Sequence, residues 1–308
     1  MIMRLLLPVF LILAGVVLAS CDASTVATMP SELGVPSSHA KMHAGSSAVS
    51  GPITLSKHLA ATWEVPLSGL LNLDHPKSVA AELVDRGEPI DIYTYSIRHP
   101  DFGTYLIDSG ISRKFRNPAG NDEIGAIVAM AMKTELLRVK LTTADLVARL
   151  GGVDGVFLTH IHIDHIMGLP DLPANTPVYI GPGDTADRAL LNAFSQGTTD
   201  RLLSVQGVLR EWQFGDGGVV DVFGDGSLYA IHSPGHTPGS TAYLAITTDG
   251  PQLMIGDATH TRWGWENGVE PGSYSSDVPL SATSLAALRE LATAVPEIRV
   301  HPGHQSLE

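Results

Sequence analysis

The 308-residue chain has a single cysteine, few aromatic residues and a shortage of basic side chains. Because Cys21 is the only cysteine, no disulfide within the chain can stabilise the fold. Lysine and arginine together number 19 against 32 aspartate and glutamate residues, which gives a formal net charge of −13. This balance, without a basic cluster, argues against nucleic acid or anionic lipid as a partner. Clustered carboxylates can instead bind cations.

The N-terminal apolar run, residues 5–19, is too short for a membrane span. Arg4 is the only charge before Asp22, so residues 1–20 predict a secretory signal peptide, and its removal changes the net charge from −13 to −14. Leu18-Ala19-Ser20-Cys21 resembles the lipobox of bacterial lipoproteins. This resemblance implies a lipid on Cys21, the membrane as a partner, and a place in the bacterial cell envelope, facing the periplasm or the exterior.

Residues 21–52 are rich in serine, alanine, glycine and proline and lack periodic apolar spacing. This composition predicts a flexible tether behind the lipidated cysteine, with His39 and His43 in solvent. The remaining residues, 53–308, are enough for one large catalytic domain with a substantial core.

Within this domain, strand patterns alternate with helix patterns. We expect a hairpin from residues 90–100 and 102–110, a buried strand at 155–159, and helices at 143–150, near 184–195 and at 281–295. Residues 111–142 predict an insertion that places an apolar helix near the mouth of the site. The mixture indicates an α/β class and a layered sandwich rather than a barrel or a helical bundle.

The stretch "THIHIDHIMG" places three histidines and an aspartate within six positions, directly after an apolar run. His160 and His162 lie two residues apart, so on an extended backbone their side chains project to one side and can share a cation. Asp164 and His165 follow a bend and are better placed for a second cation. Histidine nitrogen and carboxylate oxygen are ligands that suit zinc, iron or manganese.

Three further polar clusters also follow strand-like runs. They contain His236 in "SPGHTPGS", Asp257 in "GDATH" and His304 in "HPGHQ". Loops at the ends of rigid strands are where sites are built, so these strand ends could converge on one place.

Taken in order, "HIHIDH", "SPGHTPGS", "GDATH" and "HPGHQ" resemble the metallo-β-lactamase superfamily, over about residues 87–308. The resemblance implies an αβ/βα four-layer sandwich with a two-metal site at one edge of the paired sheets. The first metal would be held by His160, His162 and His236, and the second by Asp164, His165 and His304, with Asp257 bridging the two. Zinc is the first choice of metal, with iron, manganese or cobalt as alternatives.

The resemblance also implies a binuclear hydrolase that attacks a carbonyl with a metal-bridging hydroxide. Asp164 and Asp257 would take part as ligands, and the substrate would be a small molecule. N-acyl-homoserine lactonases carry a tyrosine three positions after the bridging aspartate, where this chain has His260. The bridging Asp257 and the length of chain from it to His304 resemble these lactonases. This resemblance favours hydrolysis of an ester bond, most of all in a lactone, with His260 assisting as a third catalytic residue.

Other activities of the same fold stay open. A thioester hydrolase of the glyoxalase II type shares all seven ligands but usually has a C-terminal helical domain. An exported β-lactamase would fit the location, although Asp257 stands where those enzymes carry cysteine or serine. An iron-dependent oxidoreductase is the alternative outside the hydrolases.

Several neighbouring residues have less certain roles. We expect His232 and His301 to be structural, and Asp108 either to orient a ligand or to cap a turn. Trp263 and Trp265 provide aromatic surface that would suit an acyl chain, ordinary core packing or a homodimer contact.

Overall fold

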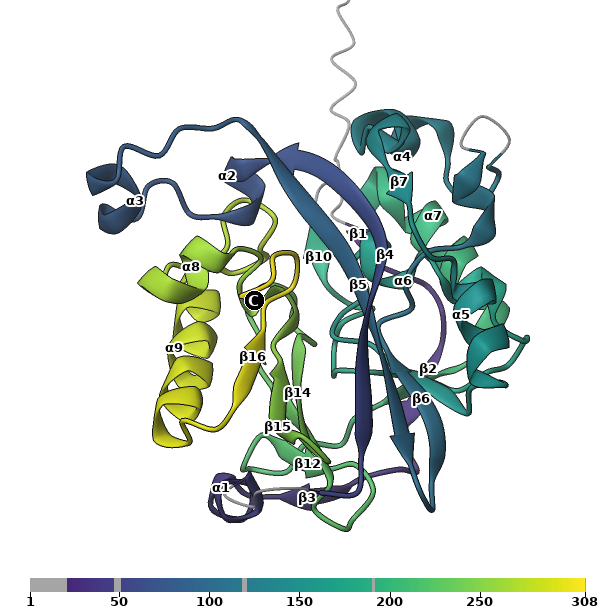
Figure 1. Cartoon of the computed structure of the whole chain (residues 1–308). Coiled ribbons are helices and arrows are strands. Elements are labelled where there is room, and N and C mark those ends of the chain that lie inside the picture. Colours follow the sequence, from purple (N-terminus) through teal and green to yellow (C-terminus); the bar gives the residue numbers. More distant parts are fainter. Residues whose placement is uncertain (1–20, 47–50, 118–120, 190–191, 308) are drawn as a thin grey trace, which may run out of the picture.

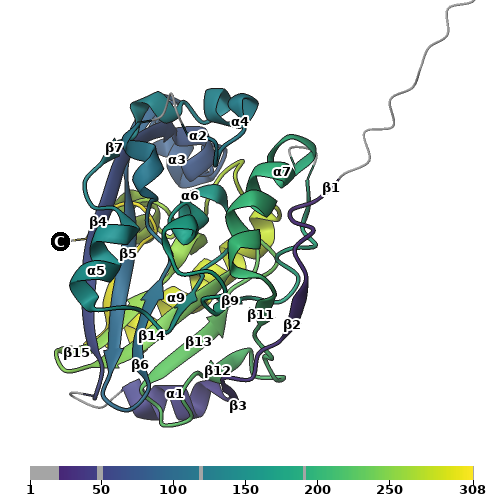
Figure 2. The ribbon, with the colours of Figure 1, turned by 90° about the vertical axis from the view of Figure 1, so that its right-hand side faces the viewer.

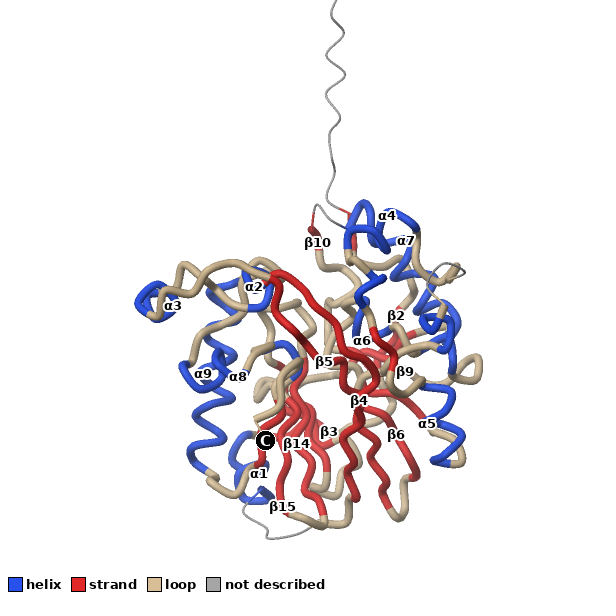
Figure 3. Tube along the Cα trace, turned by 45° about the horizontal axis from the view of Figure 1, so that its top comes forward, coloured by secondary structure: helices blue, strands red, loops and turns tan. Residues whose placement is uncertain are grey.

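The computed structural model describes residues 21–46, 51–117, 121–189 and 192–307, so the predicted signal peptide lies outside the described residues. Two β-sheets stack face to face, with helices on both outer sides (Figures 1 and 2). Figure 3 separates the sheets from the flanking helices by colour. This arrangement is the αβ/βα sandwich of the metallo-β-lactamase fold that the motifs implied.

One sheet has eight strands and is mixed, with parallel pairs at one end and antiparallel pairs at the other. In spatial order it contains β2 (Thr28–Pro30), β11 (Leu209–Glu211), β9 (Val178–Ile180), β8 (Gly155–Phe157), β6 (Gly103–Ile107), β5 (Gly87–His99), β4 (Thr54–Pro66) and β7 (Arg138–Val139). On its outer side pack α5 (Thr143–Leu150), α6 (Ile163–Ile166) and α7 (Asn192–Leu203), which share one hydrophobic cluster with its strands.

The other sheet has six strands. In spatial order it contains β16 (Arg299–His301), β15 (Gly250–Met254), β14 (Thr241–Thr247), β13 (Leu228–His232), β12 (Val219–Asp221) and β3 (Val35–Ser37). Helix α9 (Val278–Ala294) covers its outer face through Leu288 and Leu291, and Val295, directly after the helix, joins the same cluster. The remaining helices are α1 (His39–Ser46), α2 (Leu67–Leu70), α3 (Pro76–Ala80), α4 (Ala126–Ala131) and α8 (Arg262–Asn267).

The core between the sheets is aromatic at its centre although the chain has few aromatic residues. Phe157 of the eight-stranded sheet stacks on Tyr105, 4.7 Å between ring centroids, and faces Tyr243 of the six-stranded sheet at 5.9 Å. Trp212 donates through Nε1 to the hydroxyl of Tyr243 at 3.0 Å. Such packing makes the strands rigid, and rigid strands fix the positions of the loops at their ends.

The prediction of a flexible tether over residues 21–52 is wrong for residues 21–46, because this segment is bound to the body of the protein. Strand β2 pairs parallel with β11, and β3 pairs antiparallel with β12, so the segment adds an edge strand to each sheet. Met42 in α1 is completely buried in the cluster under α9. A small-residue composition did not prevent this, since strand pairing uses backbone groups that every residue has.

Most of the other predicted elements occur near the expected positions. The hairpin, the strand after residue 154 and the helices at 143–150 and 281–295 correspond to β5–β6, β8, α5 and α9. The helix expected near 184–195 is wrong: β10 (Arg188–Ala189) occupies part of that range, and α7 begins at Asn192. Strand β10 pairs with β1 (Cys21–Asp22), a partner that local sequence does not reveal. Among the described residues, no helix is long and apolar enough to cross a membrane.

Candidate metal centre

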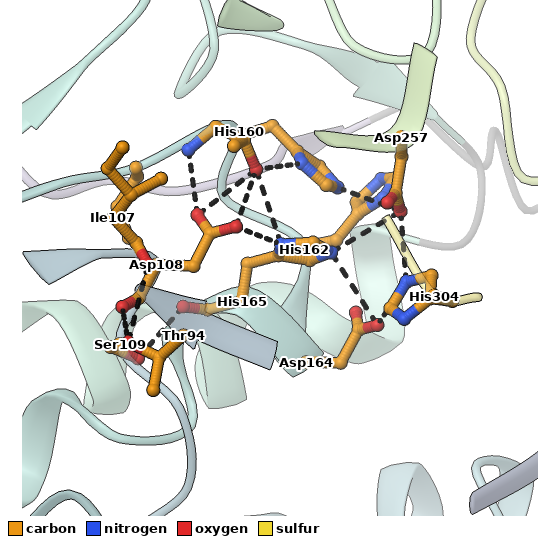
Figure 4. Close-up of polar contacts among 12 residues, drawn as sticks. Thr94, Ile107, Asp108, Ser109, His160, His162, Asp164, His165, Asp257 and His304 are labelled. Carbon is orange, nitrogen blue, oxygen red and sulfur yellow. Dashed lines mark hydrogen bonds and ion pairs between the residues drawn. The ribbon is translucent and has the colours of Figure 1, made fainter. Parts of the chain in front are cut away.

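The predicted ligands form one cluster. Figure 4 shows His160, His162, Asp164, His165, Asp257 and His304 close together. His160 and His162 follow β8, and α6 carries Asp164 and His165 in its single turn. The other three ligands follow β13, β15 and β16: His236, Asp257 and His304. Four strand ends from both sheets therefore contribute to one cluster, as expected for loops that rigid strands hold in place.

The first trio consists of His160, His162 and His236, whose candidate ligand nitrogens lie within 4.8 Å of one another. Nε2 of His236 and Nδ1 of His162 are 2.8 Å apart. The ring centroids of all three residues are 4.6–4.7 Å from each other, at nearly perpendicular angles. Three imidazoles facing one point are a donor set that suits zinc.

The second trio consists of Asp164, His165 and His304. Oδ2 of Asp164 lies 3.3 Å from Nε2 of His304 and 3.7 Å from Nε2 of His165. This set contributes one carboxylate and two imidazoles, which again suits a divalent first-row metal.

Asp257 lies between the trios. Its Oδ2 is 3.6 Å from Nε2 of His160 and 3.4 Å from Nε2 of His236 in the first trio. The same atom is 3.3 Å from Nε2 of both His165 and His304 in the second trio. One carboxylate is thus central to both groups, which is the position that a bridging ligand needs.

The unsatisfied atoms of the cluster support metal binding. His160 Nε2, His165 Nε2 and Asp257 Oδ1 are buried and have no hydrogen-bond partner among the described residues. Leaving such atoms unpaired costs free energy, so a group of them in one place indicates a missing partner. Two divalent cations would satisfy them, and the residues therefore fit the two-metal site that the motifs implied.

Several of the predicted ligand histidines have a partner on their other ring nitrogen that holds the ring in place. Nδ1 of His165 lies 2.9 Å from Oδ2 of Asp108, and Nδ1 of His304 donates to the Asp91 carbonyl at 2.8 Å. Nδ1 of His236 is 3.2 Å from the Ser275 hydroxyl. Such outer partners set which nitrogen carries the proton and leave Nε2 for the metal. Asp108 therefore orients a ligand.

Among the protein groups alone, burial lowers the pKa of His160 and His236 well below the usual value. Burial also acts to lower the pKa of His165 and His304, but the nearby carboxylates, Asp257 first and Asp164 with it, raise the pKa of both. The pKa of His165 is raised well above its usual value, and that of His304 to about 10. A metal must displace these protons, so cations and protons compete for the second trio.

His260 also lies in the cluster, although it is not one of the seven predicted ligands. Its ring is fully buried, with Nε2 3.1 Å from Oδ2 of Asp257 and Nδ1 2.9 Å from the Leu70 carbonyl. Its ring centroid is 5.0 Å from that of His236. A position facing solvent is therefore excluded, and His260 is close enough to act on a molecule bound at the centre.

Two loops of the first trio are joined by a buried carboxylate that sequence reasoning missed. Asp184 accepts from the backbone N–H of Ile161 at 3.0 Å and of Gly239 at 3.1 Å. Ile161 lies between two ligand histidines, and Gly239 follows His236 by three residues. Burial raises the pKa of Asp184 to about 7. No ligand-type motif surrounds Asp184, so only the fold reveals this link.

A close backbone approach fixes the last ligand. A Cβ atom at Gly303 would collide with Oδ1 of Asp257, so only glycine lets the C-terminal loop bring His304 to the bridging carboxylate.

The remaining candidates from the sequence lie outside the cluster. Nε2 of His232 is 2.9 Å from the Pro238 carbonyl, and Nε2 of His301 is 2.9 Å from Oε1 of Gln252. Trp263 and Trp265 pack against two separate core clusters, which favours the core interpretation of both. Tyr274, which sequence reasoning missed, is part-exposed, and its ring centroid lies 6.5 Å from that of His260.

The comparisons with known proteins agree with this geometry. The family described as Metallo-beta-lactamase superfamily matches residues 88–304, so the chain belongs to the metallo-β-lactamase superfamily. Its relatives include proteins named as a metallo-hydrolase and as N-acyl homoserine lactonases.

Among its relatives, Metallo-hydrolase mfmC of Annulohypoxylon moriforme is 26% identical over 250 residues, covering 76% of this chain and 59% of that protein. N-acyl homoserine lactonase AttM of Azorhizobium caulinodans is 28% identical over 149 residues, covering 44% of this chain and 52% of that protein. The chain thus matches little more than half the length of these relatives.

Solved structures of lactonases share the fold. A quorum-quenching N-acyl homoserine lactone lactonase superposes with a TM-score of 0.59 at 17% identity, over 83% of this chain and 93% of that one. AidC, a dizinc quorum-quenching lactonase, gives a TM-score of 0.53 at 16% identity, over 83% and 88% of the two chains.

Proposed function

We propose that the protein is a metal-dependent hydrolase that opens a lactone ring, with N-acyl-homoserine lactones as the first candidate substrates. The observation that carries the proposal is the carboxylate of Asp257 lying centrally between two complete ligand trios, with His260 directly beside it. A shared aspartate at this place is a feature of the lactonases that the motifs resemble and argues against a β-lactamase. The relatives named as N-acyl homoserine lactonases give independent support.

Two divalent cations, zinc first, would be held by the two trios and Asp257; when bound, they polarise a carbonyl and lower the pKa of a bound water. The contribution of the chain itself is to orient the ligand histidines. Asp108, the Asp91 carbonyl and Ser275 hold the ligand rings, so that their Nε2 atoms stay aimed at the centre. The buried surroundings exclude bulk water and strengthen every charge interaction in the site.

His260 is the side chain that we assign to the substrate carbonyl. A carbonyl oxygen only accepts hydrogen bonds, so Nδ1 of His260 donates to Leu70 and holds the ring with Nε2 directed at the centre, 3.1 Å from Oδ2 of Asp257. His260 would therefore lie where the lactonases carry a tyrosine, beside the oxygen that gains negative charge. A tyrosine hydroxyl would supply a hydrogen-bond donor there without a positive charge.

A substrate panel tests the proposed activity. The zinc-loaded protein is assayed with lactones of short and long acyl chains, a glutathione thioester and a β-lactam, and we expect kcat/KM to be highest for a lactone. Faster turnover of the thioester or of the β-lactam would replace the lactonase proposal by that alternative. Oxygen consumption by the iron-loaded protein would instead support the oxidoreductase alternative.

We further propose that Cys21 carries a lipid and that the enzyme is held in the bacterial cell envelope. The lipobox-like Leu18-Ala19-Ser20-Cys21 supports this proposal. Detergent phase partitioning of the wild type against Cys21→Ser tests it, and we expect only the wild type to enter the detergent phase. Equal partitioning of both proteins into the aqueous phase would contradict it.

A further inference from the structure

The residue proposed to carry lipid is fixed to the body of the protein. Cys21 pairs with Ala189 in the β1–β10 ladder, and its carbonyl accepts from Nδ2 of Asn192 at 3.1 Å. The next residue is held as well, since Nε2 of Gln196 donates to the Asp22 carbonyl at 2.8 Å. A lipid attached at Cys21 would therefore start at the N-terminal end of α7, with no tether between anchor and domain.

An exposed apolar surface lies beside this point. Ile127 and Met130 lie three residues apart on α4, so they share one face, and they are 62% and 74% exposed. Phe194 in the first turn of α7 is 59% exposed. Helix α4 contains no charged residue, and its start is joined to α7 by a hydrogen bond from Gly125 N–H to the Thr198 hydroxyl at 3.2 Å.

We define Ile127, Met130 and Phe194 as the α4–α7 face. Figures 1 and 3 place α4, α7 and β10 at the same end of the molecule, far from β3. Large apolar side chains this exposed on two neighbouring helices indicate a surface that contacts another apolar medium.

A short series of contacts links this end to the metal centre. Strand β10 pairs with Cys21, and Asp187, just before β10, accepts from the Ser276 hydroxyl at 2.6 Å. The neighbouring Ser275 lies 3.2 Å from Nδ1 of His236, a ligand of the first trio. Anchor and metal centre are thus at the same end of the molecule.

We propose that the α4–α7 face rests on the lipid bilayer that holds the lipid on Cys21; this inference depends on the lipid anchor proposed above. The lipid proposed on Cys21 would enter a bilayer directly beside this face, which indicates a membrane rather than a protein as the occupant. The net charge, −13 for the full chain and −14 without residues 1–20, disfavours attachment through anionic headgroups, so apolar side chains must supply the contact. The centre then lies close to the membrane surface and receives amphiphilic substrates that partition into lipid.

The single native cysteine allows a direct test. Once lipid occupies the sulfur of Cys21, a cysteine introduced at Ile127, Met130 or Phe194 is the only thiol for an environment-sensitive fluorophore. Val35 on β3 provides the matched control, because it is apolar, 58% exposed and at the far end of the sandwich. In vesicles of zwitterionic lipid with brominated chains, we expect quenching at the three face positions at least about threefold greater than at Val35→Cys.

Each contrary result has a separate meaning. Equal quenching at the face and at Val35→Cys would overturn the membrane contact, as would an intact mass without lipid on Cys21. Dimers in detergent with the face positions shielded from the quencher would replace the bilayer by a second copy of the chain. Lactone turnover in detergent reports the proposed activity independently, so its loss would not be confused with loss of docking.

A rate measurement tests the same proposal. Phe194→Glu places a charge on the face without touching the metal centre, and Val35→Glu is its control. We expect Phe194→Glu to lower the rate on a long-chain lactone in vesicles severalfold, while the rate on a soluble short-chain ester stays the same. An equal effect of the two variants on the vesicle rate would contradict the proposal.

Discussion

Both ends of the sandwich bury a histidine close to an aspartate, yet only one end resembles a metal site. At the far end, His99 packs against Phe102 and Phe223, with ring centroids 4.8 and 5.1 Å away. Its Nε2 is 2.9 Å from Oδ2 of Asp225, and its Nδ1 accepts from the backbone N–H groups of Asp101 and Phe102. Both nitrogens of His99 therefore have partners, and no further atom is needed.

At the metal centre, by contrast, only one of the two ring nitrogens of a ligand histidine has such a partner. His165 and His304 use Nδ1 for Asp108 and the Asp91 carbonyl and direct Nε2 into the cluster. Burial of a histidine next to a carboxylate is thus not a sign of metal binding. The informative feature is that several histidines direct one ring nitrogen at a common point while the other ring nitrogen already has a hydrogen-bond partner.

Removing the shared carboxylate should have the largest effect. Asp257→Ala takes a ligand from both trios, so we expect loss of bound metal and a fall in turnover of more than about 100-fold, beyond the loss of an outer partner. Elemental analysis and kinetics on the same sample measure both effects. Asp225→Ala is the matched control at the far end and should keep two metals per chain. A variant that retains two metals without Asp257 would show that this residue is not a bridge.

Substitution of His260 tests whether every imidazole of the cluster is a metal ligand. We expect His260→Ala to lower turnover by roughly 100-fold, the cost of one donor that serves the transition state, while metal content is unchanged. His260→Tyr should recover much of this loss if donation alone matters, and little if positive charge is required. Loss of metal from His260→Ala would instead make His260 an additional ligand.

Substitution of Asp184 tests whether the two loops that carry the first trio depend on the hydrogen bonds that join them. An amide oxygen cannot replace two carboxylate oxygens that accept from Ile161 and Gly239, so we expect Asp184→Asn to weaken metal affinity by about 10- to 100-fold. Competition with a chelator measures the affinity. Unchanged affinity would mean that the loops hold their positions without this link.

For Asp184→Asn we also predict a change in how the free energy of unfolding of the metal-free protein depends on pH. The folded chain keeps the proton on Asp184 up to about pH 7, while the unfolded chain releases it near its usual pKa of 3.8. The folded state therefore binds more protons in this window, and the free energy of unfolding should fall as pH rises from about 4 to 7. Asp184→Asn should reduce this slope in denaturant titrations, whereas an identical slope would contradict the raised pKa.

The smallest effect on activity is expected at the far end. His99→Ala leaves Asp225 and two backbone N–H groups without their partner, so we expect a loss of about 1–3 kcal/mol in unfolding free energy. Turnover and metal content should stay within experimental error of the wild type. A fall in metal content would show that the two ends are coupled and that the comparison between them does not hold.

Much of the centre could be predicted because its ligands lie in short motifs. The spacing of His160, His162 and His165 is local, and each remaining ligand follows its own strand. The partners that hold the rings could not be predicted in this way. Asp91 and the Leu70 carbonyl are 213 and 190 residues away from the histidines that they contact, and a backbone carbonyl carries no residue-specific signal.

The sequence by itself determined the ligand types, the strand and helix patterns of the domain and the family, because these depend on local order and side-chain chemistry. Only the tertiary structure decided that residues 21–46 complete both sheets, that Asp184 joins two ligand loops and that Cys21 lies at the same end as the metal centre. Strand pairing and close packing bring together backbone groups distant in sequence. Composition, which predicted a tether, contains no information about such pairing.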